Sequence, residues 1–274
     1  MKKNNYWVLF WVLLLSACQE QPVVIPPLQP PVLGERKILV EEFTGVRCVN
    51  CPAGAAEIDN LKSLYAENLV AVSIHAGFFA NPFPNHTDFR TADGDQLASY
   101  ICSPDPEPEG YPSASVNRVL FSGQEKRYVS RQSWAGFIQQ QSQIVPKISI
   151  NIENAFDATT RLLTTKITLL PTTTLTGEHR VSALLTEDDI FDKQLTPAGE
   201  IDNYRHKHVF RKALTDAIGA PLSSPLAAGT PVVKTLTYVL PTGWNVAKCH
   251  IIAFVHRNEG NEKDVLQVAE KKIQ

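Results

Sequence analysis

Two cysteines three positions apart, Cys48 and Cys51, are the residues of this 274-residue chain with the clearest capacity for chemistry. They follow an apolar run that ends in Thr44-Gly45, and an alanine- and leucine-rich helical pattern begins directly after them. A strand, a short turn and paired thiols at a helix start are typical of a thiol–disulfide exchange site. Because the thiolate is the attacking form, we expect Cys48 to be the exposed, acidified nucleophile and Cys51 to resolve the mixed disulfide.

Glu42 and Pro112 are predicted to belong to the same site. Glu42 precedes Cys48 by six residues, and this position resembles the one where thioredoxins carry a buried carboxylate that relays protons to the resolving cysteine. Whether Glu42 or Glu41 points inward depends on the strand register, and a solvent-exposed glutamate is the alternative. Pro112 stands where thioredoxin-like folds place a cis-proline opposite the cysteines; the cis form costs only about 0.5–1 kcal/mol at proline. An ordinary turn proline is the alternative there.

A metal site is the competing interpretation of the cysteine pair. One Cys-x-x-Cys supplies two thiolates, whereas a structural zinc ion takes four nitrogen or sulfur ligands. His75 and His86 show no paired-ligand spacing, and His206 and His208 alternate in a way that would chelate a metal only weakly. The chain also has no glycine-rich phosphate loop. The sequence therefore predicts neither a metal nor another cofactor.

The elements around the cysteines predict an α/β domain over residues 35–145. Ile38–Phe43 indicates a strand, Ala53–Glu67 a helix and Leu69–His75 a second strand, which together make a βαβ unit with a parallel crossover. A helix is expected from Asp93, whose carboxylate would cap it. Another helix is expected over Gln132–Ile144. This order is typical of a thioredoxin-like fold.

The composition changes near Pro146, and residues 146–274 predict an all-β domain. Six threonine-rich runs alternate with period two between Pro, Gly and Asn turns, which favours an immunoglobulin-like β-sandwich; the runs are Lys147–Phe156, Arg161–Leu169, His179–Thr186, Val232–Leu240, Lys248–His256 and Val265–Ile273. Residues 187–229 form an insertion between the third and fourth runs. An insertion of that length usually packs on a neighbour or serves function.

The first residues predict a secretion signal and a lipid anchor. Residues 1–17 combine two lysines with the apolar run Tyr6–Leu15, which is too short to span a bilayer of about 30 Å. The run leads into Cys18 through Leu-Ser-Ala, a sequence that resembles the bacterial lipobox. There the peptidase cuts before the cysteine, and the thiol is diacylated, commonly with palmitate. We therefore expect the mature chain to be anchored through Cys18.

The residues after the anchor predict an outer-membrane address. Gln19 stands where enterobacterial lipoproteins of the inner membrane carry aspartate. The sequence does not indicate whether the chain faces the periplasm or the cell surface. Residues 18–34 contain five prolines, which favour an extended tether of about 3.1 Å per residue, with disordered slack as the alternative. With a net charge of -2 and no basic stripe, the chain gives no indication of a nucleic-acid partner.

The other two cysteines, Cys102 and Cys249, leave two alternatives. In an oxidising compartment they could form a second, structural disulfide. Each could instead be a small buried apolar residue, and the apolar run around Cys249 is consistent with this.

Nearly the whole mature chain resembles the 28-kilodalton outer-membrane protein family of Bacteroidetes lipoproteins. The resemblance rests on the lipobox, the Glu-Glu-Phe-Thr-Gly-x-x-Cys-x-x-Cys-Pro motif, Gly-Tyr-Pro-Ser at 110–113, and the segments Asn203–Leu214 and Ile251–Ala269. It implies a thioredoxin-like domain joined to an immunoglobulin-like β-domain. It implies little about the biochemical role.

Two departures from thioredoxins leave the direction of exchange open. Arg47 stands before the pair where thioredoxins carry Trp, and Val49-Asn50 replaces Gly-Pro between the cysteines. We expect either thiol–disulfide exchange on protein disulfides or a binding or adhesion lipoprotein. In the second case the Cys48–Cys51 bond is structural, and residues 187–229 contribute the working surface.

Overall fold

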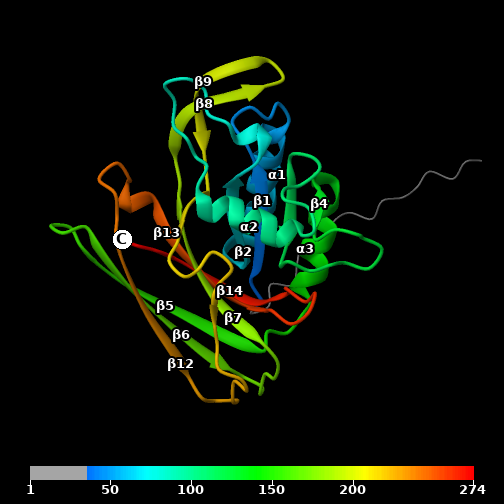
Figure 1. Ribbon diagram of the computed structural model, residues 1–274, viewed down its shortest axis with the longest axis vertical. Helices are drawn as coiled ribbons and strands as arrows, with labels where there is room; N and C mark the ends of the chain where they lie inside the picture. The colour runs from blue at the N-terminus through cyan, green and yellow to red at the C-terminus, as the bar shows by residue number, and fades with distance from the viewer. Residues whose placement is uncertain (1–35) are drawn as a thin grey trace, which may run out of the picture. The chain divides into compact units, whose positions relative to one another are not determined.

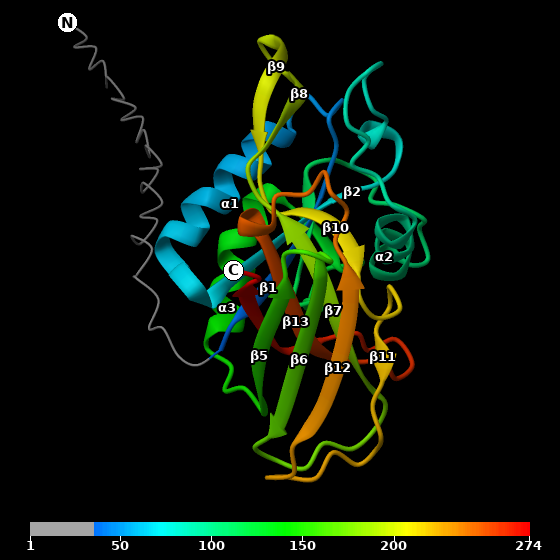
Figure 2. The ribbon, with the colours of Figure 1, turned by 90° about the vertical axis from the view of Figure 1, so that its left-hand side faces the viewer.

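The computed structural model describes residues 36–274 (Figures 1 and 2). The predicted signal peptide, the lipidation site Cys18 and the proline-rich tether lie outside the described residues. Within residues 36–274, no helix is long and apolar enough to cross a membrane.

The chain begins with a mixed α/β region whose first three elements form the predicted βαβ unit. Strand β1 (Ile38–Thr44) pairs in parallel with β2 (Leu69–His75), and helix α1 (Cys51–Tyr65) connects them. Both strands are buried along their whole length. This agrees with their mainly apolar sequences, which Glu41 and Glu42 interrupt in β1 and Ser73 in β2. The remaining elements are β3 (Ser113–Val116), β4 (Tyr128–Ser130), α2 (Ala92–Cys102) and α3 (Trp134–Ser142). β3 pairs antiparallel with both β1 and β4.

The helices of this region lie on opposite faces of its sheet: α1 and α3 on one side, α2 on the other (Figure 2). The start of α2 differs from the prediction. The Thr91 hydroxyl accepts a hydrogen bond from Gly94 N at 2.9 Å and is the cap. The Asp93 carboxylate instead accepts from Lys212 Nζ at 2.6 Å and from Ala213 N at 3.1 Å. Short 3₁₀ turns occupy Ala66–Asn68, Phe78–Ala80, Arg131–Ser133 and Val246–Lys248.

A β-rich sandwich follows, and its strands lie where the six alternating runs predict them. They are β5 (Ile148–Asp157), β6 (Leu162–Pro171), β7 (His179–Glu187), β12 (Val232–Val239), β13 (Cys249–Arg257) and β14 (Val265–Lys272). β12, β6 and β5 form a three-stranded antiparallel sheet in front of β7 and β13 (Figure 2). One apolar cluster fills the space between the layers, with members such as Leu163, Ile167, Leu185 and Ile251.

The predicted insertion contributes strands that connect the two regions. It holds β8 (Ile190–Thr196), β9 (Gly199–His206), β10 (Val209–Ala213) and β11 (Ala220–Pro221). β10 lies between β2 and β7, so one sheet runs in the order β14-β13-β7-β10-β2-β1-β3-β4. A domain boundary at residue 145 stays a prediction, and the hydrogen-bonded sheet continues past it.

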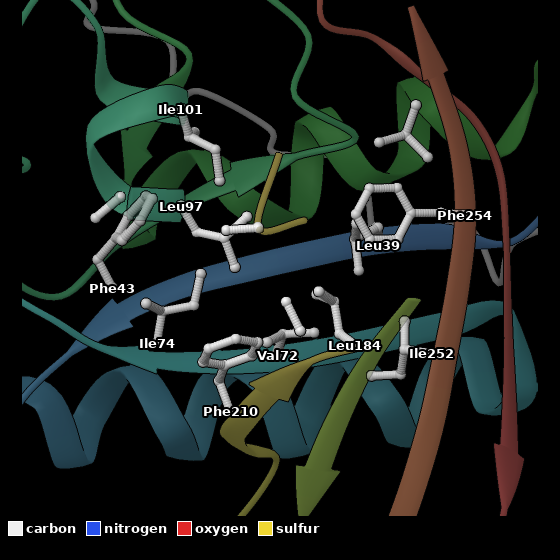
Figure 3. Packing of buried hydrophobic residues seen from close by; sticks show 14 of the residues in the cluster. Leu39, Phe43, Val72, Ile74, Leu97, Ile101, Leu184, Phe210, Ile252 and Phe254 are labelled. Atoms are coloured by element: carbon white, nitrogen blue, oxygen red, sulfur yellow. The ribbon is translucent and has the colours of Figure 1, made fainter. Parts of the chain in front are cut away.

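A second apolar cluster is built from both regions. Leu39, Val72 and Ile74 come from the α/β region, while Leu184 and Phe254 come from β7 and β13 (Figure 3). A buried ion pair lies in the same part of the molecule. Glu41 and Arg118 are both fully buried, and the guanidinium binds both carboxylate oxygens at 2.8 and 2.5 Å. The guanidinium also lies 4.7 Å from the centre of the Phe254 ring.

Breaking this pair should destabilise the fold strongly. Glu41→Gln leaves the Arg118 guanidinium buried without its counter-charge, so we expect the free energy of unfolding to fall by about 3–5 kcal/mol. The control is Glu153→Gln, which removes an exposed pair with Lys166 at 2.9 Å and should cost at most about 1 kcal/mol. Urea denaturation of the three proteins measures both values; equal losses for the two variants would contradict a structural role for the buried pair.

Candidate functional site

Cys48 and Cys51 form the predicted disulfide. Their Cα atoms are 5.3 Å apart, and Cys51 is the first residue of α1. Pro52 lies in the first turn of the helix, where its missing N–H has no intrahelical partner to lose. The short turn is closed by a hydrogen bond from Cys48 N to Gly45 O at 3.0 Å. We call residues 45–50 the disulfide loop.

The disulfide is covered, because Cys48 is 3% and Cys51 2% exposed. The expectation that Cys48 is exposed is therefore wrong. The hairpin of β8 and β9 lies over the disulfide loop (Figure 1). The Gln194 side-chain amide donates to Cys48 O at 3.1 Å and to Gly45 O at 3.2 Å, and Leu195 N donates to Val46 O at 2.8 Å. The segment that covers the disulfide lies about 145 residues away in the sequence. Local sequence patterns therefore could not connect it to the cysteines.

A second set of contacts holds the hairpin and the disulfide loop to residues 81–90. Asp192 accepts from Thr87 N at 2.7 Å and contacts His86 Nδ1 at 2.5 Å. Arg47, next to Cys48, donates to Asn81 O at 3.0 Å and to Pro82 O at 2.8 Å. The residue that replaces the Trp of thioredoxins therefore fixes the loop rather than pointing into solvent.

Glu42 faces helix α1, while Glu41 faces the opposite side of the sheet. Glu42 Oε2 accepts from Ser73 Oγ at 3.1 Å, and Oε1 has no partner among the described residues. Burial raises the pKa of Glu42 to about 8, so its carboxyl is mainly protonated at neutral pH. The alternative of a solvent-exposed Glu42 is wrong, because the residue is 1% exposed.

Pro112 lies next to the same helix turn, and its peptide bond with Tyr111 is cis, as predicted. Gly54 allows this approach: a Cβ there would lie 2.5 Å from Glu42 Oε1 and 2.8 Å from Pro112 Cβ. Pro112, Tyr111, Asn50 and Ala53 line one end of a groove of about 790 Å3 that extends along residues 123–132. The sequence analysis did not identify Gly54, because a helical glycine alone does not show what packs against it.

A cavity of about 280 Å3 lies on the other side of the first turn of α1, and Cys51 and Glu42 line it. Its opposite wall comes from the end of β9 and the residues after it, including Tyr204, His206 and Lys207. The sequence indicates His206 and His208 only as a pair that would chelate a metal weakly, and both residues line this wall. Within residues 36–274, no group of three or more His, Cys, Asp or Glu residues could hold a metal ion.

The sequence matches the profile of the outer membrane protein Omp28 family over residues 107–274. The chain belongs to the Omp28 family. This membership assigns it to the outer membrane. No curated protein matches the sequence. The matched residues include Pro112, Gln194 and His206, whereas Glu42 and the disulfide lie before them, so the family match says nothing about the disulfide.

Solved structures show related folds. HBP35 of Porphyromonas gingivalis superposes with a TM-score of 0.66 at 16% identity, over 87% of this chain and 75% of that one. A protein of Agrobacterium tumefaciens superposes with a TM-score of 0.52 at 13% identity, over 88% and 96%. A domain of the outer membrane lipoprotein Omp28 from Porphyromonas gingivalis aligns with a TM-score of 0.31 at 19% identity, over 48% and 91%. The first two likenesses show the fold alone.

The remaining described cysteines of this Omp28 family member are not paired. Cys102 and Cys249 are free and buried, in separate apolar clusters. Burial raises the pKa of both thiols, that of Cys249 to about 12, so neither is a thiolate at neutral pH. The alternative of two buried apolar residues is confirmed, and the second disulfide is not formed.

The raised pKa of Glu42 predicts a specific pH dependence of stability. Unfolded Glu42 ionises near 4.5 and folded Glu42 near 8. Between these values the folded chain holds a proton that the unfolded chain has lost, so stability falls as the pH rises. Relative to Glu42→Gln, which cannot ionise, the wild type should lose a few kcal/mol, at most about 5, between pH 5 and pH 8. Urea denaturation across this range tests it; parallel pH profiles of the two proteins would refute the shift.

Proposed function

We propose that this chain is a lipid-anchored thiol–disulfide exchange protein of the outer membrane that acts on disulfides of other proteins. The observation that carries the proposal is the arrangement at the first turn of α1. There the Cys48–Cys51 disulfide opens the helix, and the buried Glu42 carboxyl and cis-Pro112 both pack against Gly54 in its first turn. A structural disulfide alone would need neither a protonatable buried carboxyl nor a groove beside it.

In the reducing direction, the Cys48 thiolate attacks a partner's disulfide, forms a mixed disulfide and releases one partner thiolate. Cys51 then loses its proton and attacks the Cys48 sulfur, which restores the Cys48–Cys51 bond and releases the second partner thiolate. Glu42 is suited to exchange a proton with Cys51, because its pKa of about 8 lies close to the thiol value of about 8.5. The minority of Glu42 that is ionised at neutral pH is the form that accepts the Cys51 proton. The same steps run backwards for oxidation, and the Val49-Asn50 dipeptide does not decide between them.

The partner's backbone would dock in the groove beside Pro112, where an extended segment can approach the start of β3. The hairpin of β8 and β9 must then move, because Gln194 holds the carbonyl of Cys48. The proposal therefore includes an opened state in which the hairpin leaves the disulfide loop.

We assign a thioredoxin-like fold to residues 35–145 and an immunoglobulin-like sandwich to residues 146–274. The first is supported by the parallel βαβ unit, the antiparallel strands β3 and β4, and cis-Pro112. The second is supported by two packed antiparallel layers at the predicted strand positions.

Anchoring through a diacylated Cys18, after removal of residues 1–17 and with residues 18–34 as a tether, belongs to the same proposal. The lipobox-like sequence supports it. Membership of the Omp28 family and the description of a Porphyromonas gingivalis Omp28 as an outer membrane lipoprotein also support it.

A binding or adhesion lipoprotein is the second candidate, and the burial of the disulfide favours it. With Cys48 and Cys51 3% and 2% exposed, the bond would fix the loop under the hairpin. The insertion would then present its own surface, with Phe191 56% and Ile201 43% exposed on the hairpin. Exposed apolar side chains of this size on a projecting hairpin are typical of contact sites.

Trapping experiments separate the two candidates. In Cys51→Ser the resolving thiol is missing, so mixed disulfides with envelope proteins should accumulate at Cys48 and appear as high-mass bands that a reductant removes. The control is Cys48→Ser/Cys51→Ser, which keeps the buried Cys102 and Cys249 and should give none. Identical patterns for the two variants would sink the exchange proposal. A reduction potential of the wild type below about -300 mV would do so as well, because it would mark an inert structural bond.

A further inference from the structure

The cavity beside Cys51 gives the disulfide a second access route, and the hairpin residues Gln194, Tyr204 and His206 form one of its walls. Cys48 lines neither this cavity nor the Pro112 groove, whereas Cys51 lines the cavity directly. The hydrogen bonds of the hairpin go to carbonyls of the disulfide loop on the Cys48 side. A molecule in the cavity therefore lies against Cys51 rather than Cys48, with 2% of Cys51 exposed when the hairpin is closed.

The size of the cavity selects the class of molecule. Its volume of about 280 Å3 lies just below the range of roughly 300–1,000 Å3 that holds drug-sized ligands. Helix α1 closes one side, and the segment around Tyr204 and His206 closes the other. An ion pair between Lys207 Nζ and Asp59 Oδ2, at 2.7 Å, joins the two sides. A polypeptide segment does not fit between these walls, but a small molecule does.

The walls supply unused hydrogen-bonding capacity. Three residues that line the cavity each carry a buried polar atom without a hydrogen-bond partner among residues 36–274: Glu42 Oε1, His75 Nδ1 and His206 Nε2. Leaving such a group buried and unsatisfied is unfavourable, so three of them around one cavity favour a polar occupant that can reach them. Burial lowers the pKa of His75 to about 3 and that of His206 to about 4, so both rings are neutral and each offers a donor and an acceptor. Pro52, Ala55 and Ile58 make the helix side apolar.

We propose that low-molecular-weight thiols of the size of free cysteine, and their disulfides, are substrates of this site and that they react at Cys51 through the cavity. This inference rests on the proposed thiol–disulfide exchange. It differs in the reacting sulfur, because small substrates react at Cys51 whereas protein disulfides react at Cys48. A small thiol has the required size, a polar part for the unpartnered wall and a reactive atom for the disulfide.

The reaction balances without another reagent. A small thiolate attacks the Cys51 sulfur, so the bond between the two cysteines breaks, a mixed disulfide forms at Cys51 and Cys48 leaves as a thiolate. A second small thiolate attacks the small molecule's own sulfur in that mixed disulfide, which releases the small disulfide and the Cys51 thiolate. The small thiol is oxidised and the protein disulfide reduced. Cys48 is the better leaving group, because it lies before the N-terminus of α1, where a thiolate is stabilised.

Single-cysteine variants of the full chain test which sulfur reacts. Cystine is the probe, and mass spectrometry follows the addition of a cysteinyl group to Cys48→Ser, which keeps Cys51, and to Cys51→Ser, which keeps Cys48. We expect Cys51 to react at least about tenfold faster, because only it lines the cavity. Equal rates, or faster reaction at Cys48, would overturn the inference.

Filling the cavity tests the route. Ala55→Phe places a ring in the cavity and should slow cysteinylation of Cys51 in the Cys48→Ser background at least about tenfold. The matched control, Ser63→Phe, puts the same ring on an exposed position of α1 away from the cavity and should leave the rate within about twofold. Thermal unfolding of both variants checks that they fold. If Ala55→Phe does not fold, Asp59→Ala replaces it; loss of the ion pair with Lys207 should open the cavity and raise the rate. An unchanged rate in the folded variant would refute the cavity route.

The same experiments distinguish failure of the proposed exchange function from failure of the small-thiol route alone. If neither sulfur reacts with cystine and no mixed disulfides form with envelope proteins, exchange itself fails. If protein disulfides are trapped at Cys48 while cystine shows no preference for Cys51, only the small-thiol route fails.

Discussion

The position of β10 between β2 and β7 is the constraint on which the site depends. Ser73 N donates to His208 O at 2.7 Å, and Val209 pairs with Ser73, so the chain returns to the α/β sheet immediately beside Glu42. The segment that leaves β7 therefore has to cross the carboxyl end of β1 before it enters β10. The β8–β9 hairpin over the disulfide and the cavity wall at 204–208 both result from that crossing.

Local patterns were enough to predict the elements that follow one periodicity. The parallel βαβ unit and the six alternating strands lie where the sequence indicates them, because each depends on side chains close together in the chain. The cis bond at Pro112 was expected from the resemblance to thioredoxin-like folds and not from a local pattern. The burial of Cys48 was not predictable in this way. It depends on Gln194, a polar residue in a mostly polar hairpin, and nothing near Gln194 in the sequence indicates that its amide meets a carbonyl of the disulfide loop.

Glu41 and Glu42 show how strand alternation gives two neighbouring carboxyls opposite environments. On one face of β1, Glu41 forms an ion pair with Arg118, which repays part of the cost of burying both charges. On the other face, Glu42 meets only the Ser73 hydroxyl and the helix turn at Gly54, so it is buried mainly as the neutral acid. A shift of one residue in register would exchange these environments. The sequence alone does not fix the register, whereas the pairing of β1 with β2 and β3 does.

A covered disulfide is compatible with exchange if the cover opens at a modest free-energy cost. Three hydrogen bonds join the hairpin to the disulfide loop, two from Gln194 and one from Leu195, and Asp192 adds two contacts with His86 and Thr87. At about 1 kcal/mol net for each, opening costs about 5 kcal/mol and leaves roughly 0.02% of the molecules open. Protein disulfides would then react through this minor state, while a molecule in the Cys51 cavity needs no hairpin movement. Under the proposed function, the hairpin would discriminate by size, because large substrates would wait for an opening that lowers their rate several thousandfold while small ones enter the cavity.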